Sequence, residues 1–268
     1  MTNPFKADVL VVKLSGKALT ADKALDALFA ALADSAANAE RTRVVLVHGG
    51  GVEVDALMRG LGRPIDRIEG LRVSPAEDMP VIAGALAGTC SLKLRGAAQR
   101  AGLMPLGLCA TDAGIDRVVP ADPRLGRVGV IEPGDSAAKR RLQALLDAGF
   151  TPVISSVGMD AAGALWNINA DDAAVASAAL LGAPLIFLSD VPGVLDANKH
   201  LFEQLNEKQA ETLIAEGVIS GGMTVKVRAA FRAAAMTGKP VAAASVFDPM
   251  LPNKLASGQL PGTTFTLE

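Results

Sequence analysis

The sequence predicts an α/β fold, a three-layer αβα sandwich with a mostly parallel central sheet. Short uninterrupted apolar runs, typical of strands buried on both faces, alternate along the chain with segments of helical periodicity. Glycine-rich turns separate many of these segments. Half of the 268 residues are hydrophobic and 20% are charged, so the chain can bury a large core. Strands that alternate with helices indicate a parallel sheet covered by helices on both faces.

The most informative stretch is Val-Val-Leu-Val-His-Gly-Gly-Gly at residues 44–51. It predicts a buried strand that runs into a glycine loop. A helix is expected next, because apolar residues follow at helical spacing, namely Val54, Leu57, Met58 and Leu61. Glycine has no Cβ, so the backbone N–H groups at 49–51 can approach an anion, which the helix dipole would favour. A tight turn that binds nothing is the alternative.

Other apolar runs predict further strands, at residues 9–12, 106–109, 152–156, 185–188, 241–246 and 262–265. A hairpin is expected over 117–131, with a polar turn at 122–124. We expect an irregular polar segment over 63–71.

Apolar periodicity predicts the remaining helices, at about 22–39, 75–100, 142–148, 170–181, 208–216 and 223–234. The helix at 75 is expected to begin with a capping box, Ser74-Pro75-Ala76-Glu77, with proline at its first position. Asn169 or Asp171 is expected to cap the helix that ends before Gly182.

Composition excludes several classes of partner and site. The net charge of −2 argues against a nucleic-acid or anionic-membrane surface. Cys90 and Cys109 stand among apolar or small residues, which favours packing in a reducing compartment. With only two histidines, a Cys/His zinc site is not expected. A secretory signal and a run of about 18 apolar residues are both missing, so we expect a soluble cytoplasmic protein.

Two lysines, Lys13 and Lys226, stand at glycine turns. Packing explains Lys13 poorly, because it ends a buried strand and faces a glycine turn. The carboxyl ends of strands are where open α/β sheets bind ligands. A solvated loop lysine is the alternative for Lys13, and Lys17 is a weaker candidate.

Acidic and amide side chains gather in two further places. One helix cap cannot use all of Asn167, Asn169, Asp171 and Asp172, so some should face a ligand. Asp190 follows a buried strand and precedes a Pro-Gly turn. A Walker A loop, a dinucleotide G-x-G-x-x-G and a G-x-S-x-G elbow are absent from the sequence. Lysines, glycine amides and carboxylates are the groups that phosphoryl transfer needs.

The order of the motifs resembles the N-acetylglutamate kinases, a branch of the amino acid kinase family, over nearly the whole chain. The matching segments are Lys-Leu-x-Gly, His-Gly-Gly-Gly, Gly-Leu-Arg-Val, Asn-x-Asn-Ala-Asp, Ser-Asp-Val-Pro-Gly-Val-Leu and Gly-Gly-Met-x-x-Lys-Val. Gly70–Val73 and Asn167–Asp171 are more particular to that branch. The resemblance implies the amino acid kinase fold, with an acceptor-binding and dimerisation lobe at 1–182 and a nucleotide-binding lobe at 183–268.

The resemblance also implies a reaction, the ATP-dependent phosphorylation of the γ-carboxylate of N-acetyl-L-glutamate, the second step of arginine biosynthesis. Lys13 and Lys226 would stabilise charge on the phosphoryl group, and Asp171 would hold both lysines. A carboxylate acceptor is ionised at neutral pH and needs no general base.

Binding roles follow from the same resemblance. Arg72 would bind the α-carboxylate of the acceptor and Asn167 its N-acetyl side, while Gly16, Gly50 and Gly51 would donate N–H groups to phosphate and acceptor. Mg²⁺ would be carried by the nucleotide, with no dedicated protein ligands. The residues implied for the ATP pocket are Gly16, Asp190, Val191, Gly193, Val194, Leu195, Ile219, Gly221, Gly222 and Met223.

One position departs from the family pattern, since Ser15 stands where a glycine is usual. Only twelve residues precede Lys13, whereas arginine-inhibited hexamers of the family have an extra N-terminal helix. We therefore expect an arginine-insensitive homodimer with the helix from Pro75 at the interface.

Three other functions are weighed against this kinase. A sister kinase for another acidic acceptor, such as aminoadipate or glutamate, differs only in the acceptor, and Arg72 and Asn167 favour the N-acetylated substrate. A nucleotide or metabolite sensor of the same fold would be free to lose Lys13, Asp171 or Lys226, but all three are present, which favours the enzyme. An NAD-dependent oxidoreductase lacks support because its glycine fingerprint is missing.

Overall fold

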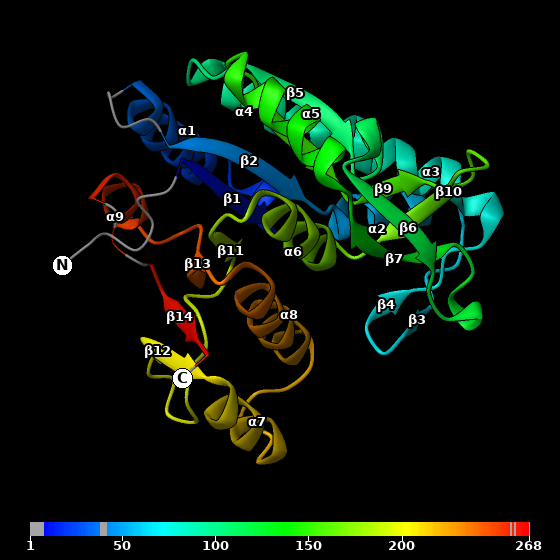
Figure 1. Ribbon diagram of the computed structural model, residues 1–268. Helices are drawn as coiled ribbons and strands as arrows, with labels where there is room; N and C mark the ends of the chain where they lie inside the picture. Colours follow the sequence, from blue (N-terminus) through cyan, green and yellow to red (C-terminus); the bar gives the residue numbers. More distant parts are fainter. Residues whose placement is uncertain (1–7, 38–41, 258, 260, 268) are drawn as a thin grey trace.

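The computed structural model describes residues 8–37, 42–257, 259 and 261–267. Its centre is an eight-stranded sheet in the order β12-β14-β13-β11-β1-β2-β8-β5 (Figure 1). Neighbouring strands are parallel except β13 and β14. The strands are β1 (Val9–Leu14), β2 (Arg43–His48), β5 (Pro105–Cys109), β8 (Thr151–Ser155), β11 (Leu185–Ser189), β12 (Gln204–Asn206), β13 (Val241–Ser245) and β14 (Thr263–Thr266).

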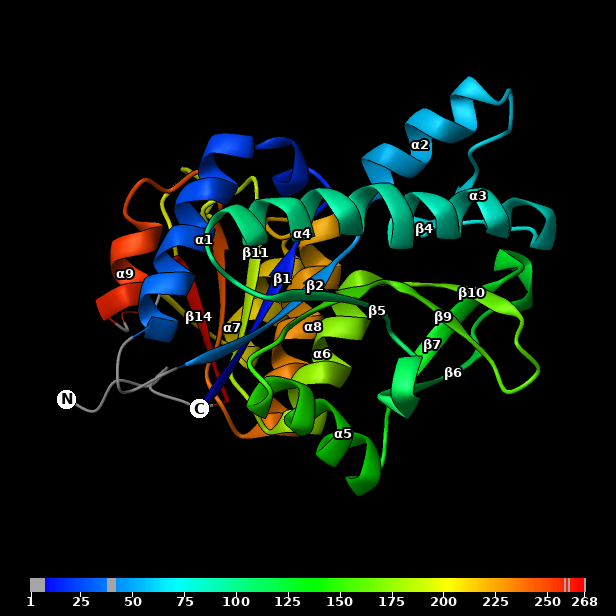
Figure 2. The same cartoon turned by 90° about the horizontal axis from the view of Figure 1, so that it is seen from above.

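Helices cover both faces of this sheet, as the three-layer prediction requires (Figure 2). One face packs on α6 (Ala170–Leu181) and α8 (Gly222–Thr237), with α5 (Ser136–Asp147) and α7 (Glu207–Ala215) at its margins. The other face packs on α1 (Asp22–Ala37), α4 (Ser91–Arg100) and α9 (Leu251–Ser257). In the described ranges, none of the helices is long and apolar enough to cross a bilayer.

A smaller region stands beside the carboxyl ends of the central strands. It contains a four-stranded sheet, β6-β7-β10-β9, and a two-stranded hairpin, β3-β4 (Figure 1). Helices α2 (Gly51–Gly60) and α3 (Met79–Ala83) pack nearby. The strands are β3 (Arg67–Ile68), β4 (Leu71–Arg72), β6 (Asp116–Pro120), β7 (Val128–Pro133), β9 (Val157–Met159) and β10 (Leu165–Ile168).

The predicted strands and most helices are confirmed within a few residues. Asn169 is the residue that caps α6, since its side chain accepts a hydrogen bond from the Asp171 N–H, and α6 ends at Leu181, followed by Gly182 with φ 66°. The hairpin over 117–131 is confirmed as the antiparallel pair β6-β7. The first helix was expected to reach 39, and its last two positions lie outside the described residues.

The capping box at Ser74 was wrong. The chain enters a 3₁₀ turn (Ala76–Asp78) before α3, and the Ser74 side chain caps neither element. Its hydroxyl is buried and hydrogen-bonded elsewhere, so the Ser-x-x-Glu pattern is incidental here.

The predicted apolar face of the helix after the glycine loop was half wrong. Val54 and Met58 are buried, but Leu57 and Leu61 are 38% and 60% exposed. Only one narrow stripe of α2 meets other side chains, because this helix lies at the margin of the molecule.

Short elements escaped the sequence analysis. The segment 63–71 was expected to be irregular, yet it contributes to the hairpin β3-β4, whose turn residues Glu69 and Gly70 have φ of 51° and 83°. Strands of two or three residues, such as β9 and β12, and the seven-residue α9 are too short to carry a period.

The helix predicted over 75–100 is continuous but not uniform. A π-helical stretch, Gly84–Cys90, separates α3 from α4. It lies against the glycine loop, because a Cβ at Gly50 would stand 2.5 Å from Cys90 Sγ and 2.9 Å from Leu86 Cδ2. Widened turns of this kind occur frequently at functional sites.

Candidate active site

Nine of the predicted site residues line a cavity of about 870 Å³ at the carboxyl ends of the central strands, namely Lys13, Gly16, Gly50, Gly51, Arg72, Asn167, Asp171, Gly221 and Gly222. Three helix N-termini reach its wall, namely α2 at Gly50 and Gly51, α6 at Ala170, and α8 at Gly221 and Gly222. Each helix end presents unpaired N–H groups and a partial positive charge. Their convergence favours a ligand with several negative charges.

The glycine loop has the close packing that requires glycine at one position. Gly50 is extended (φ −175°), so its conformation suits any residue, and only the contacts with the π-helical stretch exclude a side chain. At Gly51 a Cβ would meet nothing within 4 Å. The backbone at Gly51 is therefore open to the cavity that it lines.

His48, the last residue of β2, contacts the backbone of this loop. Its ring is fully buried, and Nδ1 lies 3.0 Å from the carbonyl oxygen of Gly49. A carbonyl oxygen only accepts, so Nδ1 carries the hydrogen. Burial lowers the pKa of His48 to about 4, which keeps the ring neutral near pH 7.

Lys13 and Asp171 form an ion pair at the wall of the cavity. Lys13 Nζ lies 2.5 Å from Asp171 Oδ1, and the side chains are 8% and 13% exposed. Lys13 is the fifth residue of β1, and Asp171 stands in the first turn of α6. A buried ion pair contributes little to stability, but it holds the Lys13 ammonium in a fixed position at the site.

Lys226 of α8 shares this electrostatic environment. Burial and the charge of Lys13 lower its pKa, while Asp171 and Asp190 oppose that shift. Lys226 does not itself line the cavity wall formed by its neighbours in α8. Asp190 lies 2.8 Å from Lys17 in an exposed pair, and this contact lowers the pKa of Asp190.

Arg72 and Asn167, which were expected to bind the acceptor, both line the cavity. The Arg72 guanidinium is buried, forms an ion pair with Asp55 and donates from Nη2 to the carbonyl of Gly51 at 3.3 Å. Within the described part of the chain, its Nη1 is buried and has no hydrogen-bond partner. An unpaired guanidinium nitrogen beside a cavity is suited to a carboxylate.

The residues predicted for nucleotide binding divide into two groups. Gly16, Gly221 and Gly222 line the cavity. Gly193 and Val194 are buried against β14, where the Val194 N–H donates to Thr263 Oγ1 at 2.8 Å. The remaining residues also stand off the cavity wall, namely Asp190, Val191, Leu195, Ile219 and Met223.

Several cavity residues were not singled out by the sequence analysis. Arg228 and Arg232 of α8 line the cavity, and their spacing of four places them on one helix face. Arg232 forms an ion pair with Asp172, and Arg228 with Glu211 at 3.2 Å. Arg67 and Glu69 reach the cavity from the β3-β4 hairpin, which the sequence analysis missed.

Ser15, the departure from the family pattern, has a local role. Its Oγ accepts a hydrogen bond from the Ala18 N–H at 3.3 Å. The hydroxyl thus supports the turn that follows β1.

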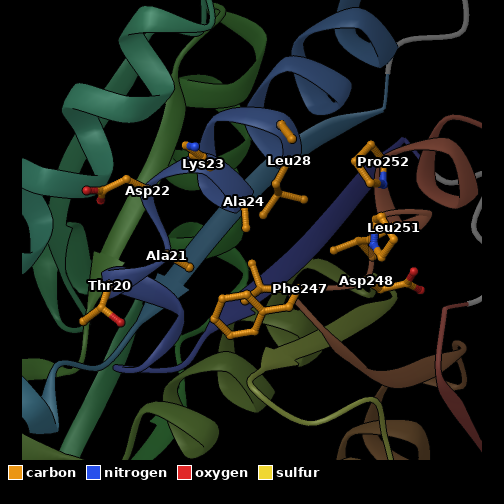
Figure 3. A pocket seen from close by; sticks show the side chains of 13 residues that line it. Thr20, Ala21, Asp22, Lys23, Ala24, Leu28, Phe247, Asp248, Leu251 and Pro252 are labelled. Carbon is orange, nitrogen blue, oxygen red and sulfur yellow. The ribbon is translucent and has the colours of Figure 1, made fainter.

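A second cavity, of about 660 Å³, lies between α1 and the segment that leads into α9 (Figure 3). Residues of α1, such as Lys23 and Leu28, and the segment that leads into α9, with Phe247, line it. It contains none of the predicted site residues. Among the described residues there is also no group of three or more His, Cys, Asp and Glu side chains placed to hold a metal ion.

Comparisons with known proteins show which family the chain resembles. The model of the amino acid kinase family matches residues 8–244. An acetylglutamate kinase of Vibrio vulnificus (strain YJ016) is 47% identical over 265 residues, which cover 99% of each chain.

Two solved structures share the fold. N-acetylglutamate synthase from Neisseria gonorrhoeae has a TM-score of 0.81 at 24% identity, over 97% of this chain and 59% of that chain. A carbamate kinase from Giardia has a TM-score of 0.67 at 17% identity, over 97% of this chain and 99% of that chain. At these identities the likeness concerns the fold alone.

Proposed function

The chain belongs to the amino acid kinase family, and from this membership we propose that it phosphorylates the γ-carboxylate of N-acetyl-L-glutamate with ATP. The products are N-acetyl-L-glutamyl 5-phosphate and ADP, and the reaction is a step of arginine biosynthesis. The observation that carries the proposal is the convergence of three helix N-termini on the cavity that holds Lys13 and Arg72. Because the reaction consumes ATP, we place it in the cytoplasm.

The chemistry requires little beyond positioning and charge neutralisation. A γ-carboxylate oxygen forms a bond to the γ-phosphorus as the bond to the ADP oxygen breaks, and no proton is transferred. The carboxylate is already ionised, so the reaction needs no general base. The buried, neutral His48 is therefore not required as one. The main difficulty is bringing an anion against a polyanion, and the lysines offset that repulsion.

Each catalytic group has a specific role in the proposal. Lys13 and Lys226 neutralise the charge that develops on the transferring phosphoryl group. Asp171 holds Lys13 in place through the ion pair and raises the pKa of Lys226 through its charge. Arg72 binds the α-carboxylate through its guanidinium, and Asn167 binds the N-acetyl side.

The nucleotide binds in the lobe that begins at 183, and the acceptor in the lobe formed by 1–182. Gly16, Gly221 and Gly222 at the cavity support phosphate binding through their N–H groups. Asp190 and the turn of Val191, Gly193, Val194 and Leu195 border the nucleotide, together with Ile219 and Met223. Mg²⁺ arrives with the ATP phosphates, which supply the hard oxygen ligands that this ion prefers.

A homodimer is part of the proposal. β5 is an edge strand of the central sheet, and Leu92 on the adjacent α4 is 60% exposed. An edge strand beside exposed apolar side chains favours association with a second copy. The chain mass is 27.4 kDa, so light scattering should give about twice that mass, and a value near six times it would contradict the dimer.

The first experiment is an assay of ATP-dependent acyl phosphate formation, trapped as hydroxamate. N-acetylglutamate, glutamate and N-acetylaminoadipate are compared for the wild type and Lys226→Ala. Product with N-acetylglutamate alone, lost in the variant, supports the proposal. Product with another acceptor would indicate a sister kinase, and ATP binding without any product would indicate a sensor.

A further inference from the structure

Ser74 connects the two residues proposed to bind the acceptor. It is completely buried, its Oγ lies 3.1 Å from the carbonyl oxygen of Arg72, and the same Oγ lies 3.0 Å from Nδ2 of Asn167. Ser74 follows β4, whereas Asn167 belongs to β10, so one hydroxyl joins two separate elements of the cavity wall.

The rules of hydrogen bonding fix the direction of both contacts. The Arg72 carbonyl can only accept, so Ser74 donates its single hydroxyl hydrogen there. Only lone pairs then remain on Oγ, and Asn167 must present its NH₂ group to them. The opposite orientation of the amide would bring two acceptor oxygens together. The network therefore decides which end of the Asn167 amide is which.

We propose that the Ser74 hydroxyl is a positioning group, which leaves Asn167 Oδ1 free to accept a hydrogen bond from the amide N–H of an N-acylated acceptor. Asn167 lines the cavity, and within the described residues its side chain has no hydrogen bond besides the one to Ser74. This inference rests on the proposed function and deepens it, because it names the atom that recognises the acylated nitrogen.

The backbone around Ser74 keeps the hydroxyl in place. The Ser74 N–H donates to Leu125 O at 2.9 Å, and the Arg127 N–H donates to Ser74 O at 2.7 Å. The Asn167 N–H in turn donates to Arg127 O at 2.8 Å. Gly126 has φ 71°, and a Cβ there would stand 2.7 Å from Ser74 O, so the approach of this loop depends on glycine.

The test replaces the substrate N–H with an atom that cannot donate. N-acetyl-L-glutamate is compared with 2-acetoxyglutarate of the same configuration, in which an ester oxygen replaces the nitrogen. A site that accepts from the N–H group leaves Oδ1 opposed to an acceptor in the ester. The wild type should therefore prefer the amide by about a hundredfold or more in kcat/KM.

Ser74→Ala releases the Asn167 amide to turn, and the preference for the amide substrate should fall by about tenfold. The KM for ATP should change by less than about twofold, because the nucleotide side is untouched. Ser74→Thr keeps the hydroxyl and should keep the preference. If Ser74→Ala does not fold, Ser74→Cys, with its weak donor and acceptor, serves instead.

A binding measurement separates this inference from the proposed reaction. Trp166 is the only tryptophan, the chain has no tyrosine, and Trp166 precedes Asn167, so its fluorescence reports on the acceptor site. If the wild type binds the amide more tightly than the ester but forms no product, the proposed kinase reaction is contradicted and the Ser74 inference is not. The variants are then compared by binding. The Ser74 inference is overturned if the wild type shows no amide preference, or if Ser74→Ala retains it.

Discussion

The ammonium of Lys13 and the carboxylate of Asp171 lie 2.5 Å apart, one on the central strand β1 and the other in the first turn of α6. The pair joins the sheet to one of the helices that point at the cavity. Because both side chains are largely removed from water, neither can leave the other without an uncompensated charge.

Lys13→Ala and Asp171→Asn should each lower kcat for acyl phosphate formation by a factor on the order of 10²–10³, with smaller effects on either KM. The reason is that the charge on the transferring group is then no longer neutralised in a fixed geometry. Lys93→Ala is the matched control, because its pair with Asp22 at 2.9 Å is exposed and outside the cavity. Equal losses in Lys93→Ala and Lys13→Ala would refute the assignment.

Alanine at Gly50 should affect stability, whereas alanine at Gly51 should affect substrate binding. Gly50→Ala places a methyl group against Cys90 and Leu86 and should reduce the free energy of unfolding by about 1–3 kcal/mol. In Gly51→Ala the added methyl group meets no atom within 4 Å, so the free energy of unfolding should be unchanged. Because Gly51 lines the cavity, the KM of at least one substrate should rise. Urea unfolding and steady-state kinetics on both variants check this, and a destabilised Gly51→Ala would contradict it.

The sequence predicted the central sheet except for the short strand β12, because most of its strands are uninterrupted apolar runs. Lys13, Arg72, Asn167 and Asp171, which the sequence analysis placed in one site, all line one cavity, and their proposed roles come from the motif order of the family. Position relative to a strand end was the physical signal for Lys13 alone.

Failures came where a local pattern competed with a distant partner. Ser74 was assigned to a helix cap because Pro75 and Glu77 follow it, and nothing in the sequence reveals that its hydroxyl contacts Asn167. Leu57 and Leu61 share the period of Val54 and Met58, but the period does not say how wide a stripe the neighbouring elements cover.

His48 should make stability fall in acid. The folded ring has a pKa of about 4 because it is buried, whereas the unfolded ring titrates near 6.5. Between these values the unfolded chain binds more protons, so the free energy of unfolding decreases as the pH falls from 6.5 toward 4, by up to about 3 kcal/mol. His48→Asn retains a donor for Gly49 without a titrating group, and urea unfolding at pH 7 and 4.5 should show a smaller loss for it. A wild type and variant with the same acid dependence would exclude this source.

Asp116 should act in the opposite direction. It begins β6, it is buried, and this burial raises its pKa to about 8. In this case the folded chain holds the extra proton between about pH 4 and 8, so its contribution is present in acid and is lost as the pH rises. Asp116→Asn is uncharged at every pH, and between pH 6 and 8 it should keep about 3 kcal/mol that the wild type loses. Parallel stability curves for the two proteins across this range would disprove the assignment.

The strand order of the central sheet also affects how the chain folds during its synthesis. β1 leaves the ribosome first, and it pairs with β2 on one side, but its other partner is β11, with Val11 opposite Leu185. At about 5–20 residues per second, β1 waits on the order of ten seconds or more for that neighbour to be translated. During this interval the nascent chain exposes one edge of a strand that is buried along its whole length in the folded protein, so it is a natural client for ribosome-associated chaperones, and the sheet closes only once β11 has emerged.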